Sequence, residues 1–159
     1  MGVVSLFGLE TRRGGRRRRM KYTDSQLNRI YDRTSGYCHI CCKKLSFKNY
    51  GRYGERGAWH VEHSRPRARG GTDHGNNLYA ACIDCNLKKS TLSTRTARAW
   101  YGRRRAPLSR ERRIEAKRSA ALAWGILGAA AGALFGPWGV VAGALIGAKI
   151  GHETDPDEC

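Results

Sequence analysis

Two Cys-x-x-Cys pairs, Cys38 with Cys41 and Cys82 with Cys85, are the clearest chemical feature of the sequence. A Cys-x-x-Cys turn points two sulfurs at one ion, and two such turns complete the tetrahedral four-sulfur site of structural zinc. We therefore expect these thiolates to hold a structural zinc ion. Free thiols are typical of a reducing compartment, so we expect a cytoplasmic protein. Cys42 is left over, and we expect it to be a free thiol.

The segment between the two cysteine pairs carries side chains suited to hydrolysing a phosphodiester. This reaction needs a base for the attacking water and a cation that stabilises charge on the phosphate. A histidine with its ordinary pKa of about 6.5 accepts a proton at neutral pH, and this segment contains His60, His63 and His74. Glu62 and Asn86 offer oxygen ligands, which suit Mg²⁺ or Mn²⁺ better than zinc. His60 shares a strand face with Glu62 by period two, and either contact with phosphate or metal or a supporting role is open to it.

These motifs, in this order, resemble the HNH endonucleases, specifically the zinc-knuckle branch of the ββα-metal nucleases. The resemblance covers residues 22–101 and rests on an acidic residue before His63, glycines 70–71, the pair Asn77-Leu78, and an asparagine after the second cysteine pair. It implies that His63 is the general base and that Glu62 and Asn86 bind a catalytic Mg²⁺ or Mn²⁺. It also implies that Asn77 braces the loop and orients the histidine. The family more often has Asp where this chain has Glu62.

Basic residues dominate the chain up to residue 118. The sequence has 30 Lys and Arg against 13 Asp and Glu, and all but one of the basic residues precede residue 119. Such an excess favours phosphate backbones, although anionic lipids would attract it too. We expect DNA as the partner, with a merely solvated basic face as the alternative for any single residue. The expected backbone contacts are Arg65, Arg67, Arg69, Lys88, Lys89, Arg95 and Arg98.

The elements that must position these side chains are short. Thr23 or Asp24 caps an expected helix over residues 24–35, which Gly36 ends. Strands are expected over residues 59–63 and 78–81, and a basic helix over residues 86–101. The expected fold class is α+β, a small ββα-metal core stapled by the zinc knuckle and followed by an apolar helical hairpin. The expected organisation is a basic disordered tail (1–21), a nuclease domain (22–101), a basic linker and helix (102–118), a glycine-zipper segment (119–151) and an acidic tail (152–159).

The segment 119–151 is apolar and rich in glycine. Between residues 120 and 150 only Lys149 is charged, and glycines recur every four residues in two runs, from Gly128 to Gly136 and from Gly139 to Gly151, which places each run on one helical face. The segment resembles a glycine zipper, and small faces of this kind let apolar helices pack closely in membranes. Gly136-Pro137-Trp138 interrupts it, so we expect a hairpin, although each half is shorter than the ~20 residues of a spanning helix. Membrane association is the favoured interpretation, as a shallow hairpin or as a single kinked span, and self-association or a soluble helix pair stays open.

Together these features predict a metal-dependent endonuclease that hydrolyses DNA. A non-catalytic zinc-knuckle module that only binds DNA is one alternative, but binding alone needs none of Glu62, His63 and Asn86. A nuclease toxin with a membrane-active C-terminal segment is another, and a delivery domain or an immunity partner would support it. The expected cofactors are a structural Zn²⁺ and a catalytic Mg²⁺ or Mn²⁺.

Overall fold

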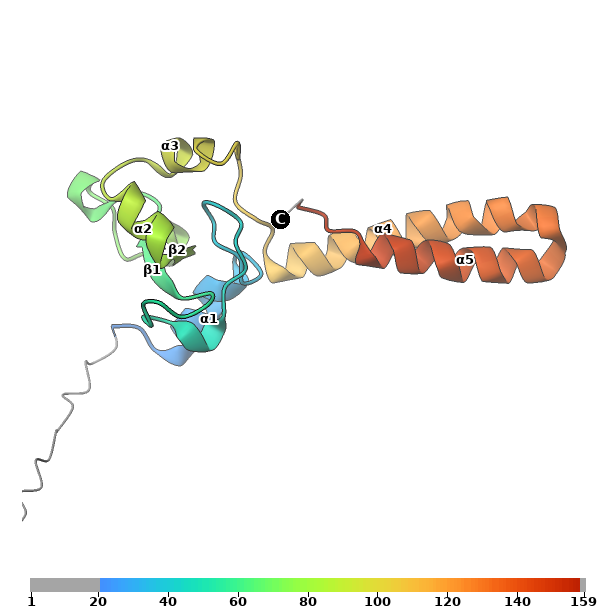
Figure 1. Ribbon diagram of the computed structural model, residues 1–159, viewed down its shortest axis with the longest axis horizontal. Coiled ribbons are helices and arrows are strands. Elements are labelled where there is room, and N and C mark those ends of the chain that lie inside the picture. Colours follow the sequence, from blue (N-terminus) through green and yellow to red (C-terminus); the bar gives the residue numbers. More distant parts are fainter. Residues whose placement is uncertain (1–20, 158–159) are drawn as a thin grey trace, which may run out of the picture.

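The computed structural model describes residues 21–157 of the protein. Figure 1 shows a small mixed domain, from which a long pair of helices projects. This arrangement confirms the expected α+β class. The predicted disordered tail lies outside the described residues, apart from Lys21. The helices and strands, in chain order, are α1 (Asp24–Asp32), η1 (Phe47–Asn49), β1 (Trp59–His63), η2 (Arg67–Arg69), η3 (Gly75–Asn77), β2 (Leu78–Cys82), α2 (Ile83–Lys89), α3 (Thr94–Ala99), α4 (Arg110–Gly132), η4 (Ala133–Phe135) and α5 (Gly136–Glu153).

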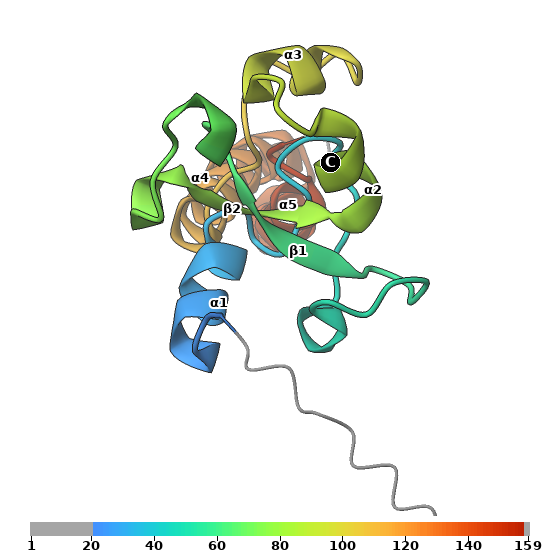
Figure 2. The same ribbon diagram turned by 90° about the vertical axis from the view of Figure 1, so that its left-hand side faces the viewer.

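The centre of the mixed domain is an antiparallel pair of strands followed at once by a helix. β1 pairs with β2 so that Trp59 lies opposite Cys82 and His63 opposite Leu78. α2 begins directly after β2 and packs against both strands, while α1 packs against β2 (Figure 2). This ββα unit places the end of β1 and the first turns of α2 close together.

A small apolar core holds the ββα unit in place. Thr23 and Gln26 form a reciprocal capping box at the start of α1, which buries Leu27 and Ile30. Trp59 is fully buried at the start of β1, and its ring contacts the ring of Tyr31 at a centroid distance of 5.4 Å. Such aromatic contacts add to the burial energy of a core that is otherwise short of large apolar side chains.

The basic helix predicted over residues 86–101 is two helices, and that prediction was wrong. α2 ends at Lys89, because Ser90 has a left-handed φ of 46° and leaves the helical path. Ser93 then caps α3 by accepting a hydrogen bond from the Thr96 amide. Serine and threonine side chains bind nearby backbone groups and so compete with the hydrogen bonds of a helix. The sequence from Ser90 to Thr94 is rich in these two residue types.

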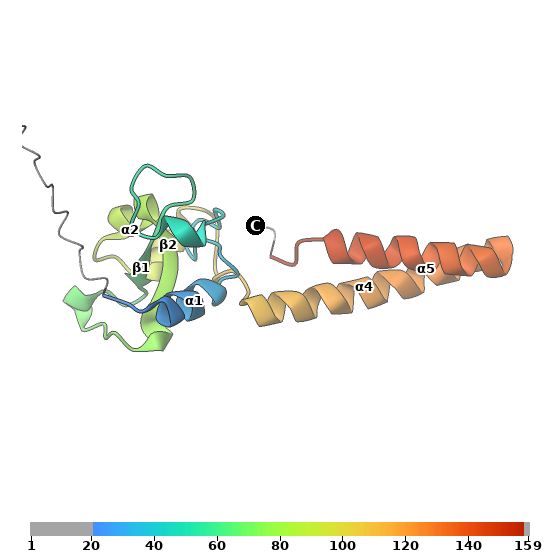
Figure 3. The same ribbon diagram turned by 90° about the horizontal axis from the view of Figure 1, so that it is seen from below.

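The C-terminal helices form the expected hairpin. α4 begins at a Ser109 cap and runs without a break to Gly132, so the expected border at residue 119 is no structural boundary. Residues on both sides of this border are mostly good helix formers, which explains the continuity. The chain reverses near Gly136, which has a φ of 78°, and α5 returns beside α4 with Pro137 in its first turn (Figure 3).

Glycines bring α4 and α5 into backbone contact. A Cβ atom added at Gly128 would lie 2.0 Å from the carbonyl oxygen of Gly143, and one at Gly132 would lie 2.0 Å from that of Gly139. No larger residue fits at these positions without moving a helix. The glycine face therefore serves the packing of the hairpin itself.

The last described residues fold back onto the base of the hairpin. Arg113 Nη1 lies 2.6 Å from Asp155 Oδ1, and its Nη2 contacts Asp157. The Leu108 amide donates to Asp157 at 2.6 Å. The segment predicted as an acidic tail is thus part of a polar clamp where the hairpin meets the mixed domain.

Candidate functional site

The four predicted zinc ligands lie together. The sulfurs of Cys38, Cys41, Cys82 and Cys85 all lie within 4.8 Å of one another, and Sγ of Cys41 lies 3.8 Å from Sγ of Cys82. A tetrahedral site with Zn–S bonds of about 2.3 Å separates its sulfurs by about 3.8 Å. The donor set and its spacing therefore fit zinc. Among the described residues, this is the one group of three or more Cys, His, Asp or Glu arranged for a metal ion.

The cysteine cluster joins the knuckle to the ββα unit. Cys82 ends β2 and Cys85 lies in the first turn of α2, whereas Cys38 and Cys41 belong to a turn that follows α1. A hydrogen bond from Cys38 lowers the pKa of both Cys41 and Cys85, which favours the thiolate form that binds metals. The expectation of a free thiol at Cys42 was wrong, because this residue is disulfide-bonded.

His63 ends β1 and lies in a charged cluster with an acidic residue that sequence reasoning missed. Its Nε2 atom lies 2.6 Å from Oδ1 of Asp73, and Arg67 Nε lies 3.3 Å from the same nitrogen. Lys21 Nζ lies 3.0 Å from the second carboxylate oxygen of Asp73. The hydrogen bond from His63 lowers the pKa of Asp73, and a second hydrogen bond from Arg67 lowers it further. The only sequence signal for Asp73 was its place two residues after the Gly-Gly loop.

Asn77 holds the loop that follows His63. Its Oδ1 accepts from the Arg65 amide at 2.6 Å, and its Nδ2 donates to the carbonyls of Arg65 and Thr72. The Asn77 carbonyl accepts from the Ser64 amide at 2.8 Å. Through these contacts one side chain fixes both ends of the loop that carries Arg67 and leads to Asp73.

Glu62 is buried and turned away from solvent, with 3% of its surface exposed. Its Oε1 lies 2.6 Å from Lys89 Nζ, and its Oε2 lies 2.7 Å from His39 Nε2. Burial raises the pKa of Glu62, but His39 and Lys89 outweigh this effect, so its pKa lies below the ordinary value. The carboxylate is therefore an ionised, internally paired group.

His39, which lies inside the zinc knuckle, completes this buried cluster. Burial lowers its pKa, so the ring is neutral. Nη2 of Arg98 lies 3.1 Å from Nδ1 of His39. Nε of Arg98 donates to the carbonyl oxygen of His39 at 2.8 Å. Because the guanidinium can only donate, Nδ1 is the acceptor and Nε2 carries the ring proton that faces Glu62. The Tyr79 ring stacks on His39 at a centroid distance of 4.9 Å.

Lys89 does not contact nucleic acid in this fold, and that prediction was wrong. Its side chain is 1% exposed, and Nζ binds Glu62 and donates to the carbonyl of His63 at 3.1 Å. The helical position of Lys89 turns it toward the strands, whereas its neighbour Lys88 points outward. Arg98 is also only partly exposed, because its guanidinium is engaged with His39. The exposed members of the predicted contact set are Arg65, Arg67, Arg69, Lys88 and Arg95.

An open hollow of about 330 Å³ lies beside the end of β1. His63, His60 and Asn86 all line it, so the structure brings the predicted base and one predicted metal ligand together. Burial lowers the pKa of His60, which favours its neutral form. Glu62 does not line the hollow, because its carboxylate is held beneath by Lys89 and His39. The remaining lining residues are Lys21, Tyr22, Tyr50, Val61 and Arg67.

An antiparallel strand pair, a following helix and a four-cysteine cluster that could hold a metal ion make up the ββα arrangement, with a histidine and an asparagine lining one hollow. Residues 38–92 match the family model described as HNH endonuclease. The match covers 55 of the 159 residues, so over that segment the chain is similar to the HNH endonucleases. No curated protein and no solved structure matches the chain.

Proposed function

We propose that the protein is a metal-dependent endonuclease that hydrolyses phosphodiester bonds in DNA, with His63 as its general base. The observation that carries the proposal is the contact between His63 Nε2 and Asp73 at 2.6 Å, beside Asn86 in an open hollow. It supports a base, because a carboxylate partner fixes the orientation and the tautomer of a histidine. The match of residues 38–92 to HNH endonucleases supports the same reaction.

The mechanism follows from the protonation state of His63. Asp73 and Arg67 both approach His63 Nε2, and they require opposite tautomers, because a carboxylate accepts and a guanidinium donates. We take the shorter contact, 2.6 Å to Asp73 against 3.3 Å to Arg67, as the hydrogen bond, which leaves Nδ1 to accept a proton from the attacking water. Asp73 then stabilises the imidazolium that forms. Arg67 limits the negative charge of Asp73, and Asn77 holds the intervening loop, so both are positioning residues.

A divalent metal at the hollow would be held by Asn86, and when bound it would supply charge stabilisation at the phosphate and the leaving oxygen. The donor chemistry of an amide and a carboxylate oxygen fits Mg²⁺ or Mn²⁺. Asn86 faces the hollow directly. Oε1 of Glu62 pairs with Lys89, and Oε2 lies 2.7 Å from His39 Nε2 without forming a hydrogen bond. Glu62 would join Asn86 as a second ligand by turning its carboxylate out toward the hollow.

A non-catalytic DNA-binding domain is the second candidate, and the buried pair of Glu62 and Lys89 favours it. In that case the carboxylate is a structural group, and the exposed arginines still bind phosphates. The two candidates differ in one result, because the binding domain retains DNA without cutting it.

Cleavage of a supercoiled plasmid separates the candidates. We expect nicking with Mg²⁺ or Mn²⁺ that stops with a chelator, is lost in His63→Ala, and is kept in His152→Ala, an exposed histidine near the end of α5. Parallel single-stranded DNA and RNA substrates test the preference for DNA. Binding without metal-dependent nicking contradicts the nuclease and supports the second candidate.

The segment 119–151 forms a separate part of the proposal. By length and composition the helical stretch Arg110–Glu153 is apolar enough to cross a membrane, and only 6% of its most apolar window is buried within the protein. We propose that this segment associates with a membrane or with a second copy of the chain, since either partner would cover its apolar side chains.

A further inference from the structure

The hairpin carries its small residues inside and its large apolar residues outside. Gly128, Gly132, Gly143 and Gly147 lie at the contact between α4 and α5, each close to the backbone of the opposite helix. A soluble helix pair buries its large apolar side chains instead. The large apolar residues that the hairpin exposes are Ile114, Leu122, Trp124, Ile126, Leu127, Leu134, Phe135, Trp138, Val141, Leu145, Ile146 and Ile150.

The exposed apolar surface surrounds both helices and the turn between them. Leu127 on α4, Leu145 on α5 and Trp138 at the turn are 60%, 68% and 85% exposed. Soluble monomers rarely expose apolar patches beyond a few hundred Å². A protein partner covers one face, whereas lipid covers all faces at once. From this geometry we infer that the hairpin inserts into a lipid bilayer as a re-entrant unit, turn first, with both of its ends on the same side.

The dimensions of the hairpin suit this insertion. From Gly136 to Ala148, just before Lys149, α5 carries no charged residue, and at 1.5 Å per residue this stretch is about 20 Å long. It is shorter than a hydrocarbon core of ~30 Å, so the turn enters the core without crossing it, as a re-entrant hairpin requires. The turn around Leu134, Phe135 and Trp138 carries no charged side chain that would resist entry. Because each helix satisfies its own backbone hydrogen bonds, neither needs water or a further partner inside the bilayer.

The base of the hairpin carries the charge that fits an anionic membrane surface. Its exposed basic residues lie just before α4 and in the first nine residues of that helix, and apart from Ile114 the exposed apolar residues begin at Leu122, about one turn after Arg118. Basic residues at this depth meet headgroups and add affinity for anionic lipids. They are Arg104, Arg105, Arg110, Arg112 and Arg118.

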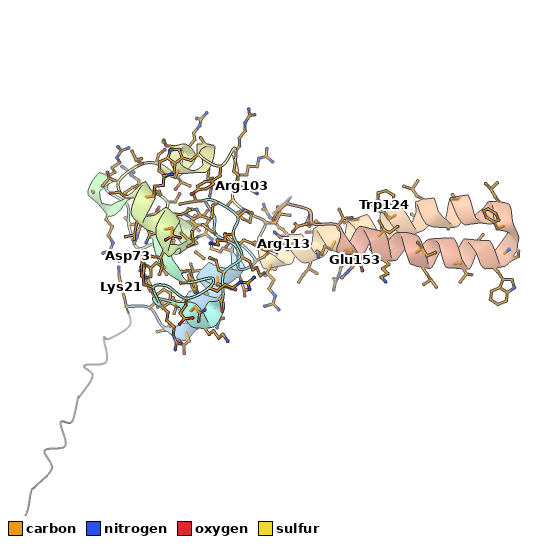
Figure 4. All side chains as sticks on the ribbon, viewed as in Figure 1. Lys21, Asp73, Arg103, Arg113, Trp124 and Glu153 are labelled. Carbon is orange, nitrogen blue, oxygen red and sulfur yellow. The ribbon has the colours of Figure 1, made fainter. Side chains whose placement is uncertain are left out.

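The junction between the hairpin and the mixed domain fixes the direction in which the nuclease domain faces. Arg113 binds Asp155 and Asp157, and its guanidinium lies 4.6 Å from the ring centroid of Tyr37 in the mixed domain. Figure 4 shows Arg113 at this junction and Asp73 with Lys21 on the opposite side of the domain. Insertion of the hairpin therefore turns the hollow beside His63 away from the membrane and toward the aqueous phase, where DNA reaches it.

The inference is tested on the full chain with vesicles of phosphatidylcholine and phosphatidylglycerol, by flotation. We expect the protein to float with the vesicles and Leu145→Arg to lower its partition coefficient about 100-fold, since a charge in the hydrocarbon core is strongly unfavourable. Leu87→Arg is the matched control, because Leu87 is similarly exposed at 64% but lies on α2 of the nuclease domain. This variant should partition like the wild type. Both substitutions replace exposed side chains, and circular dichroism checks that each variant retains its helices.

Two further measurements, protease digestion of a C-terminal tag and light scattering, complete the test together with the partitioning. A C-terminal tag should be digested by external proteinase K, and a tag protected inside the vesicles overturns the re-entrant arrangement. Equal partitioning of wild type and Leu145→Arg shows binding by surface charge alone and overturns insertion. A protein that stays out of the vesicles as a dimer by light scattering assigns the apolar surface to a second copy. None of these readings depends on DNA cleavage, so insertion and the proposed nuclease activity succeed or fail separately.

Discussion

Replacing Lys89 by methionine tests whether this lysine is a buried partner of Glu62 or a contact to DNA. Methionine fills a similar volume but leaves the Glu62 carboxylate buried beside a neutral His39. Lys89 and Glu62 are 1% and 3% exposed, and their charged atoms lie 2.6 Å apart. Removing one partner of such a pair lowers the free energy of unfolding by about 3–5 kcal/mol, a large share of the stability of a small domain. Urea unfolding of the zinc-loaded protein measures this loss.

Lys88→Met provides the matched control on the same helix. The Lys88 ammonium is exposed and lies 4.8 Å from the Trp100 ring centroid, so its loss should lower stability by less than about 1 kcal/mol. If Lys88 contacts one phosphate, its loss reduces the slope of log affinity against log salt by about 0.9, whereas Lys89→Met leaves the slope unchanged. The double variant Glu62→Gln with Lys89→Met should recover most of the lost stability. A stable Lys89→Met protein with a reduced salt slope refutes the buried pair.

Three further results follow from the structure. The protein should contain one zinc per chain by elemental analysis, and Cys82→Ser should lose both this zinc and the near-ultraviolet circular dichroism of the folded domain; a metal-free protein with an unchanged spectrum contradicts the zinc site. Asp73→Asn should slow DNA cleavage about 10–100-fold in single-turnover assays while DNA affinity, measured by fluorescence anisotropy, stays within about twofold; an unchanged rate removes Asp73 from the site. Burial raises the pKa of Asp155, but the Asp157 amide and Arg113 outweigh it and leave this pKa below its ordinary value. The contribution of Asp155 to stability is therefore full above the unfolded pKa of about 3.9 and is lost as the pH falls through the lower folded value. The unfolding free energies of wild type and Asp155→Asn should converge only in that acid range, and convergence near neutral pH argues against the clamp.

The sequence predicted those parts of the site that depend on local spacing. Two Cys-x-x-Cys turns, the strand ending at His63 and the helix after Cys82 follow from short-range patterns, and the structure has them close to the expected residues. Period two also placed His60 and Glu62 on one strand face. It did not show that the knuckle folds over that face and brings His39 against Glu62.

The misjudged features depend on contacts between distant segments. Lys89 was predicted to bind DNA from its charge, yet its position on α2 turns it toward β1. Asp73 reaches His63 only because Asn77 closes the loop between them. The break at Ser90 was a local signal, but the basic residues on both sides suggested one continuous helix. Charge and periodicity suggest which side chains could bind DNA or a metal, and tertiary packing decides which of those side chains are exposed.

We propose His63 as the general base of DNA hydrolysis. The most direct measurement is the single-turnover cleavage rate of a DNA duplex by wild type and His63→Ala, with equal zinc content and saturating Mg²⁺ or Mn²⁺. General-base catalysis contributes about 10²–10⁴ in rate, so the variant should cleave slower by that factor while binding the duplex with unchanged affinity. Equal cleavage rates for the two proteins would contradict the assignment of His63.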